Sequence, residues 1–262
     1  MVYKYTIATS VMIFMLCILC GCSQPVYEDK QTTEDTEKDE TSGNGEGSIQ
    51  DEDDDIAYEM LQWEGELNKY RFEDDGSIRL YDESAKAGTA VITSRISSLR
   101  KTCWLISVRM SFNPSANNYV RFYLGASDSD LNGSLNGYFI QLGGSKEDRL
   151  YLYRQDGEET TLLDATGEIM KGDSSPELEI KAECDSNGTF SISTSIAPYP
   201  EIHSIVFQDV TYQEAPYCGI RCTYTASNSK KVRFYSVKVH HEVDDYENLT
   251  PEEFEPSPQT AF

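Results

Sequence analysis

The chain has 262 residues, with 45 Asp and Glu against 22 Lys and Arg, and a formal net charge of -23 at pH 7. A chain of this length accommodates one large β domain or two small ones. The acidic balance and the lack of a basic cluster exclude nucleic acid from the expected partners, because contacts of Lys and Arg with phosphates supply most of that affinity.

The negative charge is concentrated towards the two ends of the chain. Residues 23–57 hold thirteen acidic residues against two Lys, and residues 241–262 hold seven with no Lys or Arg. The first of these segments is too poor in apolar residues to offset its chain entropy. We therefore predict a signal peptide (residues 1–21), an acidic disordered tether (22–57), one folded domain (58–243) and an acidic C-terminal tail (244–262).

The first 22 residues resemble the signal of a bacterial lipoprotein. Lys4 precedes an uncharged apolar run over residues 7–19, which is too short to span a bilayer comfortably, and Leu19-Cys20-Gly21-Cys22 follows as a lipobox. We expect cleavage before Cys22 and lipidation of Cys22, because several acyl chains together give stable membrane attachment. Ser23 in place of Asp at the next position implies an outer-membrane lipoprotein, facing the periplasm or the cell surface. An ordinary secretory signal is the alternative.

Short strands separated by turn signals dominate the rest of the chain, which predicts an all-β fold, an antiparallel two-sheet β-sandwich. A hairpin is expected over residues 70–81 and a strand over 90–96. Residues 104–112 alternate with Trp104, Ile106 and Val108 on one side, the pattern of a strand with one buried face. Further strands are predicted over residues 119–124, 138–142 and 149–154, and then 160–163, 178–184, 189–194, 217–224 and 232–240.

Three motifs in the central part of the body resemble a known family. They are Phe112-Asn-Pro-Ser-Ala-Asn-Asn-Tyr119, then Asp130-Leu-Asn-Gly-Ser-Leu-Asn-Gly-Tyr-Phe139 with Gly143-Gly144, and Leu152-Tyr-Arg-Gln-Asp-Gly157. They are similar to the β-sandwich region of bacterial surface proteins that also carry a lamin tail domain. The resemblance spans roughly residues 63–239 and implies a jelly roll of the concanavalin-A-like lectin/glucanase fold. That family has no well-defined biochemical role, and nothing is carried over from the lamin tail.

Polar and aromatic side chains alternate with the inward residues of the four central strands. If these strands neighbour one another, as sequential strands usually do, their outward residues form one surface. Aromatic rings stack on sugars, and Arg and Gln satisfy hydroxyl groups. The sequence therefore predicts a site for glycan or for another surface protein that contains Arg109, Arg121, Tyr123, Gln141 and Tyr151. The alternative is a Tyr-rich sheet face that other parts of the fold cover.

Patterns for metal binding and catalysis are incomplete. Residues 128–133 match the first half of an EF-hand loop, but the twelfth position is Phe139 instead of Glu, so we interpret them as turn formers. Glu177 and Glu179 alternate on a predicted strand, yet the third acid of the glucanase pattern arrives at the wrong offset. We predict no metal site, no cofactor and no catalytic residue.

Four cysteines lie in the predicted domain. Cys218 and Cys222 are four residues apart on one strand, so their Cα atoms are about 13 Å apart, too far for a disulfide. An oxidising compartment permits a bridge between Cys103 and Cys184, whereas free buried cysteines are also common in strands.

These observations favour a lipid-anchored, non-catalytic module of the cell envelope that binds glycan or another extracellular ligand. A structural envelope spacer with no small-molecule ligand is the first alternative. A divergent glycoside hydrolase is the second.

Overall fold

The structure is a computed structural model, and it describes residues 58–144 and 148–241. They belong to one of the two compact units of the chain, Glu52–Phe262. The predicted signal peptide, tether and C-terminal tail lie outside the described residues, so the predicted domain boundaries stay predictions. Within the described ranges, no helix is long and apolar enough to cross a membrane.

The described residues form strands connected by short loops and two 3-10 helices. The elements are β1 (Glu64–Gly65), η1 (Leu67–Lys69), β2 (Tyr70–Phe72), β3 (Ile78–Leu80), β4 (Gly88–Arg95), β5 (Thr102–Met110), β6 (Tyr119–Ala126), β7 (Leu135–Gly143), β8 (Leu150–Gly157), β9 (Glu159–Ala165), β10 (Glu177–Cys184), β11 (Thr189–Ile196), β12 (Tyr199–Gln208), β13 (Tyr217–Tyr224), η2 (Ala226–Asn228) and β14 (Val232–His241).

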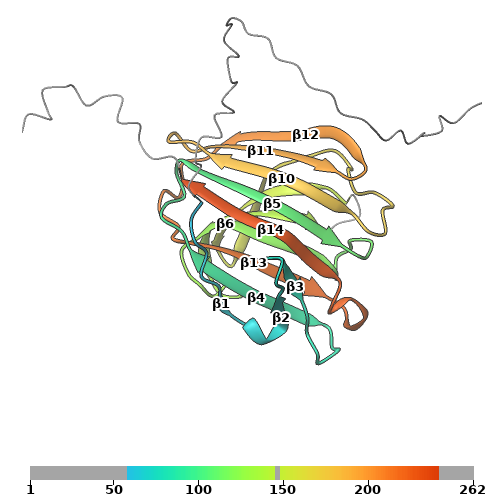
Figure 1. Cartoon of the computed structure of the whole chain (residues 1–262). Helices are drawn as coiled ribbons and strands as arrows, with labels where there is room; N and C mark the ends of the chain where they lie inside the picture. The colour runs from blue at the N-terminus through green and yellow to red at the C-terminus, as the bar shows by residue number, and fades with distance from the viewer. Residues whose placement is uncertain (1–57, 145–147, 242–262) are drawn as a thin grey trace, which may run out of the picture. The chain divides into compact units, whose positions relative to one another are not determined.

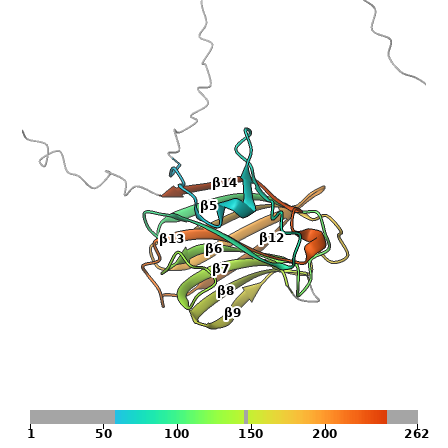
Figure 2. The same ribbon diagram turned by 90° about the horizontal axis from the view of Figure 1, so that it is seen from below.

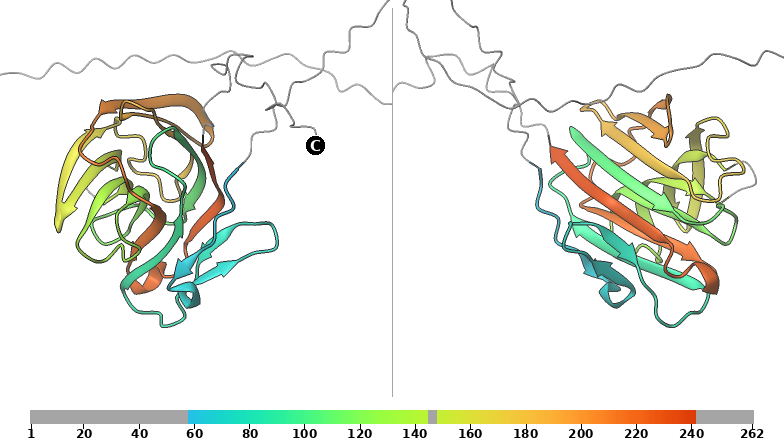
Figure 3. Two further views of the ribbon diagram at one scale, coloured as in Figure 1. Left: turned by 90° about the vertical axis from the view of Figure 1, so that its left-hand side faces the viewer. Right: turned by 45° about the vertical axis from the view of Figure 1, so that its right-hand side comes forward.

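The strands pair into two antiparallel sheets of seven strands each, which confirms the predicted fold class. Sheet A has the order β12-β11-β10-β5-β14-β3-β2, and sheet B has the order β1-β4-β13-β6-β7-β8-β9 (Figure 1). The two sheets lie on one another as two layers (Figure 2). The predicted hairpin of β2 and β3, drawn in cyan, lies at one edge of sheet A and projects from the layers (Figure 3).

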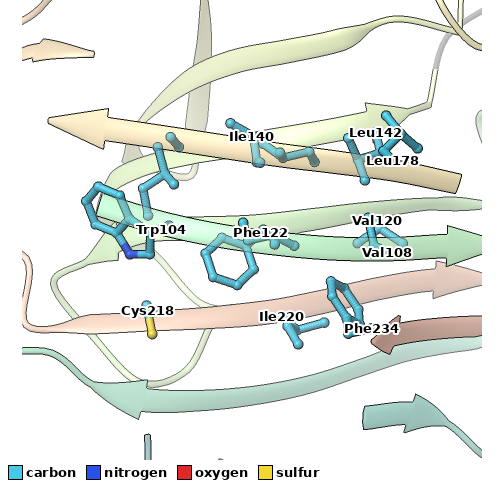
Figure 4. Packing of buried hydrophobic residues seen from close by; sticks show 14 of the residues in the cluster. Trp104, Val108, Val120, Phe122, Ile140, Leu142, Leu178, Cys218, Ile220 and Phe234 are labelled. Carbon is cyan, nitrogen blue, oxygen red and sulfur yellow. The ribbon is translucent and has the colours of Figure 1, made fainter. Parts of the chain in front are cut away.

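The core fills the space between the layers, because both sheets turn the apolar residues of their alternating pattern inward. Trp104 and Val108 of β5 are fully buried and lie over Phe122 of β6, Ile140 of β7 and Ile220 of β13 (Figure 4). Every second residue of each central strand therefore packs between the sheets, and the residues that alternate with them face away from this core.

Strand β5 does not neighbour β6, which corrects the predicted arrangement of the central strands. β5 pairs with β10 and β14 in sheet A, whereas β6, β7 and β8 pair in succession in sheet B. The chain crosses from one layer to the other between Met110 and Tyr119, as connections in Greek-key sandwiches do. The sequence pattern fixes which side of each strand is buried, but it carries no information about the sheet to which the strand belongs.

Strand β12 lies in a segment for which no strand was predicted. It forms the edge of sheet A, and its Tyr199, Ile202 and Val206 are each at least 65% exposed. Because apolar residues also point outward on β12, the alternation of polar and apolar residues that marks a strand is lost. Proline at position 200 also disfavours a strand, except at sheet edges and bulges. Both signals that identify strands were therefore missing.

All four cysteines of the described domain are buried, and no disulfide joins them. Cys103 and Cys184 lie on the paired strands β5 and β10, but Cys103 is opposite Glu183 and Cys184 is opposite Thr102. This offset of one residue places the two thiols on opposite faces of sheet A. The bridge that the compartment would permit is therefore absent from the structure.

Asp209 ties the segment after β12 to sheet B. Its carboxylate accepts hydrogen bonds from the Tyr138 hydroxyl (2.8 Å), from Nη1 of Arg154 (2.7 Å) and from the backbone N–H of Thr211 (2.8 Å). Burial alone would raise the pKa of Asp209, but these donors outweigh it and lower the pKa from 3.8 to about 2. The ionised carboxylate therefore stabilises the junction between the two sheets.

Candidate ligand-binding site

The outer face of sheet B brings most of the predicted site residues together. Arg121 on β6 lies directly opposite Gln141 on β7, and Gln141 lies directly opposite Tyr151 on β8. Arg221 on β13 extends this row on the other side of Arg121. The neighbouring row, two residues further along the strands, contains Tyr123, Phe139 and Tyr153. The two rows form because β6, β7 and β8 are neighbours in sheet B, and Figure 2 shows these strands side by side.

The aromatic row is packed inside the protein and is not an open stacking surface. The ring centroids of Tyr123 and Phe139 are 5.0 Å apart, and those of Phe139 and Tyr153 are 5.1 Å apart with nearly parallel planes. Tyr123 and Phe139 are fully buried, and Tyr151 is 5% exposed. Tyr123 and Tyr151, predicted to contact ligand, are therefore packing residues in this structure, as the alternative interpretation expected.

The loop between β6 and β7 covers this row. The loop, residues 127–134, turns back over sheet B and places Leu131 in a small apolar cluster with Tyr123, Phe139, Val91 and others. A Cβ atom at position 219 would lie 2.7 Å from Cδ1 of Leu131 and 2.8 Å from the backbone carbonyl oxygen of Ile92, so Gly219 leaves room both for the neighbouring strand and for the covering loop.

The side chains of Asp128 and Asp130 shape the covering loop. Each carboxylate accepts a hydrogen bond from the backbone N–H two residues further on, at 2.9 and 3.0 Å. These are the local turn contacts typical of Asp, which confirms the interpretation of these residues as turn formers. Among the described residues, no group of three His, Cys, Asp or Glu side chains could hold a metal ion.

A polar cleft of about 330 Å³ lies between the covering loop and the start of β9. Its lining includes Arg121, Arg221, Asn132, Ser134, Gln155, Glu158 and Thr160. Tyr123 also lines the cleft, and its hydroxyl donates a 2.9 Å hydrogen bond to Oε1 of Gln155. Burial raises the pKa of Tyr123 above that of an ordinary phenol, so the hydroxyl remains a donor at neutral pH. The lining of the cleft is therefore mostly polar, and the Tyr123 hydroxyl contributes a donor to it.

Neutral amide groups fix the two arginines of the cleft. Nε of Arg121 donates to Oε1 of Gln141 at 2.8 Å, and Nε of Arg221 donates to Oδ1 of Asn132 at 3.0 Å. The guanidinium of Arg121 also lies 4.5 Å from the ring centroid of Phe139. Gln141 is itself 6% exposed, and its Nε2 donates to the carbonyl of Gly143 at 2.9 Å, so it orients Arg121 and is too buried to be a main ligand contact.

The structure does not bring Arg109 together with the other four predicted site residues, which corrects its predicted place on their sheet face. It lies on β5 in sheet A, where it is opposite Glu177 on β10 and Arg233 on β14. Its Nη1 is 3.7 Å from the Glu177 carboxylate, and both side chains are largely solvated. Because β5 belongs to sheet A, its outward residues lie on the outer face of sheet A and not on that of sheet B.

The acidic residues of β10 lie on the outer face of sheet A. Leu178 and Ile180 point into the core, and Glu177 and Glu179 point away from it, as their alternation predicted. Oε1 of Glu179 accepts a 2.6 Å hydrogen bond from Ser107. Arg109 and Ser107 therefore engage these two carboxylates on a face remote from the covering loop.

Sequence reasoning missed Arg221 and Asn132. Arg221 lies between inward-facing Ile220 and Cys222 on a strand that was predicted, so its outward direction could have been inferred. Its position opposite Arg121 could not, since it depends on the pairing of β13 with β6 across about a hundred residues of sequence.

No protein-family model matches the sequence, and no curated protein matches it. Solved structures do match the fold. The exoplasmic/lumenal domain of VIP36, in a form bound to Ca²⁺ and Man3GlcNAc, has a TM-score of 0.53 at 13% identity, over 74% of this chain and 86% of that chain. Its metal-free form gives a TM-score of 0.52 at 13% identity, over 72% and 87%. The carbohydrate-binding module CBM66 from Bacillus subtilis gives 0.47 at 15% identity, over 69% and 96%.

These structures are lectin-like β-sandwich domains that bind carbohydrate. At such low identity the likeness establishes the fold of this chain and no more.

Proposed function

We propose that this protein is a lipid-anchored, non-catalytic module of the bacterial cell envelope, of the kind found in lamin-tail surface proteins, and that it binds glycan in the cleft beneath the covering loop. The observation that carries the proposal concerns Arg221, which lines the cleft and whose buried Nη1 has no hydrogen-bond partner among the described residues. A buried donor left without a partner costs stability, and a ligand that accepts its hydrogen bond removes that cost.

The chemistry of the cleft suits a saccharide. Arg121 and Arg221 offer donors, and Asn132, Ser134, Gln155 and Thr160 offer groups that donate and accept. Sugar hydroxyl groups also donate and accept, so a cleft of mixed polarity satisfies them better than an apolar pocket does. The fold is shared with VIP36, whose solved form contains Man3GlcNAc, and this supports the proposal at the level of architecture.

The absence of a catalytic role is part of the proposal. Of the described residues that line the cleft, Glu158 is the one carboxylate. Glycoside hydrolysis generally requires two carboxyl groups, about 5 to 5.5 Å apart in retaining enzymes and wider apart in inverting ones. The lining therefore favours binding over hydrolysis.

The membrane attachment rests on the sequence. The lipobox Leu19-Cys20-Gly21-Cys22 places a lipidated cysteine at the start of the mature chain, and Ser23 favours the outer membrane. We infer an outer-membrane lipoprotein whose tether separates the cleft from the lipid surface. The partners are then the membrane, through the acyl chains, and an extracellular or periplasmic glycan.

A glycan array probed with the full-length chain in detergent tests the proposal. We expect binding to a restricted set of saccharides, and we expect Arg221→Gln to reduce it by about tenfold or more, since hydrogen bonds from a charged donor contribute about 1.5–3 kcal/mol. Arg79→Gln is the matched control, because Arg79 is exposed on the other sheet and also lies opposite an arginine, Arg233. Equal binding by the two variants would place the ligand elsewhere.

A further inference from the structure

The two arginines of the cleft face each other across neighbouring strands. Arg221 on β13 and Arg121 on β6 are direct Cα partners in the register of sheet B, and both side chains line the cleft. Like charges in directly opposite positions destabilise a sheet. The free protein bears this cost. Arg79 and Arg233 are also opposed in sheet A, but Arg233 pairs with Asp75, whereas the arginines of the cleft pair with no described carboxylate.

The described residues supply no carboxylate that pairs with either arginine. No described carboxylate forms an ion pair with Arg121 or Arg221. Acidic residues are abundant in this chain, and other arginines are paired closely, such as Arg154 with Asp209 and Arg233 with Asp75, both at 2.7 Å. In the cleft, the orienting groups are instead the neutral amides of Gln141 and Asn132. The amides fix the guanidinium groups and leave their charge intact.

The donors that remain are positioned for an anion. Each arginine uses Nε for its amide contact. Arg221 also forms a side-chain hydrogen bond with Tyr119, and Arg121 forms one with Tyr123, so these further partners are phenols and not carboxylates. Nη1 of Arg221 is buried and meets no hydrogen-bond partner in the part of the chain that the structure describes, and the guanidinium of Arg121 lies over the ring of Phe139. Partial burial weakens solvent screening, so an anion that contacts both forks gains more than it would at an open surface.

The positive field also acts on a neighbouring tyrosine. Burial alone would raise the pKa of Tyr119, but side-chain hydrogen bonds with Thr223 and Arg221 and the charges of Arg121 and Arg221 lower it below that of an ordinary phenol. The region around the arginine pair therefore favours negative charge, even though the exposed carboxylate of Glu158 lies elsewhere on the lining of the cleft.

We infer that the glycan bound in this cleft is acidic, and that a carboxylate or sulfate group of the sugar contacts both Arg121 and Arg221. This inference rests on the proposed glycan-binding function and specifies its ligand class. The planar fork of an arginine matches either group through two parallel hydrogen bonds. Neutral sugars would leave the arginine pair repelling and Nη1 of Arg221 without an acceptor of matching charge.

Matched pairs of saccharides test this inference on the full-length chain in detergent. Oligogalacturonate is compared with its methyl ester, which removes the carboxylate charge, and a sulfated galactan oligosaccharide is compared with its desulfated form. We expect the acidic member of at least one pair to bind about tenfold or more tightly than the neutral member, since a charge-assisted contact contributes about 1.5–3 kcal/mol. The pair that responds identifies the group as carboxylate or sulfate.

Variants locate the effect. Arg121→Gln and Arg221→Gln should each abolish most of the preference for the acidic member, and Arg79→Gln should preserve it. Arg221→Lys keeps the charge but loses the fork, so it should bind with intermediate affinity. Chemical denaturation of each variant confirms folding, and increasing salt should weaken acidic binding through screening.

The possible outcomes separate the two proposals. Equal binding of acidic and neutral members, lowered by Arg221→Gln, overturns the acidic ligand and keeps the glycan-binding function. Binding of no saccharide overturns both. A preference for acidic sugars that Arg79→Gln lowers as much as Arg221→Gln overturns the assignment to this cleft, because the arginines of sheet A would then be the source of affinity.

Discussion

Tyr123 provides a direct test of the closed aromatic row. The side chain is fully buried between Phe139 and the covering loop, and its hydroxyl donates to Gln155. Replacing a buried aromatic residue by alanine costs about 3–5 kcal/mol of unfolding free energy, through lost transfer energy and the cavity that remains. Removing the hydroxyl alone costs about 1 kcal/mol. We therefore expect about 4 kcal/mol for Tyr123→Ala and about 1 kcal/mol for Tyr123→Phe.

Guanidinium denaturation of the purified protein measures these differences. Tyr199→Ala is the matched control, because Tyr199 on the edge strand β12 is 68% exposed. It should change the free energy of unfolding by no more than about 0.5 kcal/mol. A loss below about 1 kcal/mol for Tyr123→Ala would refute the reasoning. The covering loop would then lie open in solution, and Tyr123 would again be a candidate for stacking on a sugar.

Three further predictions concern other parts of the chain. Asp209→Asn should cost about 2 kcal/mol at pH 7. This cost should fade as the pH drops from about 4 to about 2. The pKa of Asp209 is about 2 in the folded protein and 3.8 otherwise, so its ionised carboxylate stabilises the fold fully above the higher pKa and no longer does so below the lower one. Urea denaturation across this range checks it, and an equal deficit at both ends would contradict the network. Cys22→Ser should abolish incorporation of radioactive fatty acid; equal labelling of the variant would exclude lipidation at Cys22. Deletion of residues 24–55 should leave the thermal midpoint of the domain unchanged within a few degrees, as a segment without buried area contributes no packing. A large fall would mean that this segment packs on the domain.

The alternation of side chains was sufficient to predict most strands and the buried side of each. Trp104, Ile106 and Val108 lie in the core as the period of two requires, and the turn before β11 uses Asn187-Gly188, with φ of +80° at Gly188. Pairing between strands was a different matter. The assumption that sequential strands are neighbours held for β6, β7 and β8 and failed for β5, because a chain that changes layer leaves no mark on local periodicity.

The candidate site was predictable only in part for the same reason. Arg121 and Gln141 were identified because both lie on strands adjacent in sequence and in space. Arg221 and Asn132 reach the cleft through long-range pairing and through a loop that folds back over the sheet. The burial of Tyr123 and Tyr151 also depends on tertiary cover, since a Tyr-rich strand reads the same whether a loop covers it or solvent does.

The opposed arginines have a consequence for attempts to improve this protein as a reagent. A position that destabilises the unliganded fold is among the first to be replaced when variants are selected for heat resistance alone. Substituting either Arg121 or Arg221 removes the like-charge repulsion across β6 and β13 and leaves the layers and the core untouched. A thermostable derivative obtained in this way would keep the sandwich and lose one of the two opposed positive charges of its cleft.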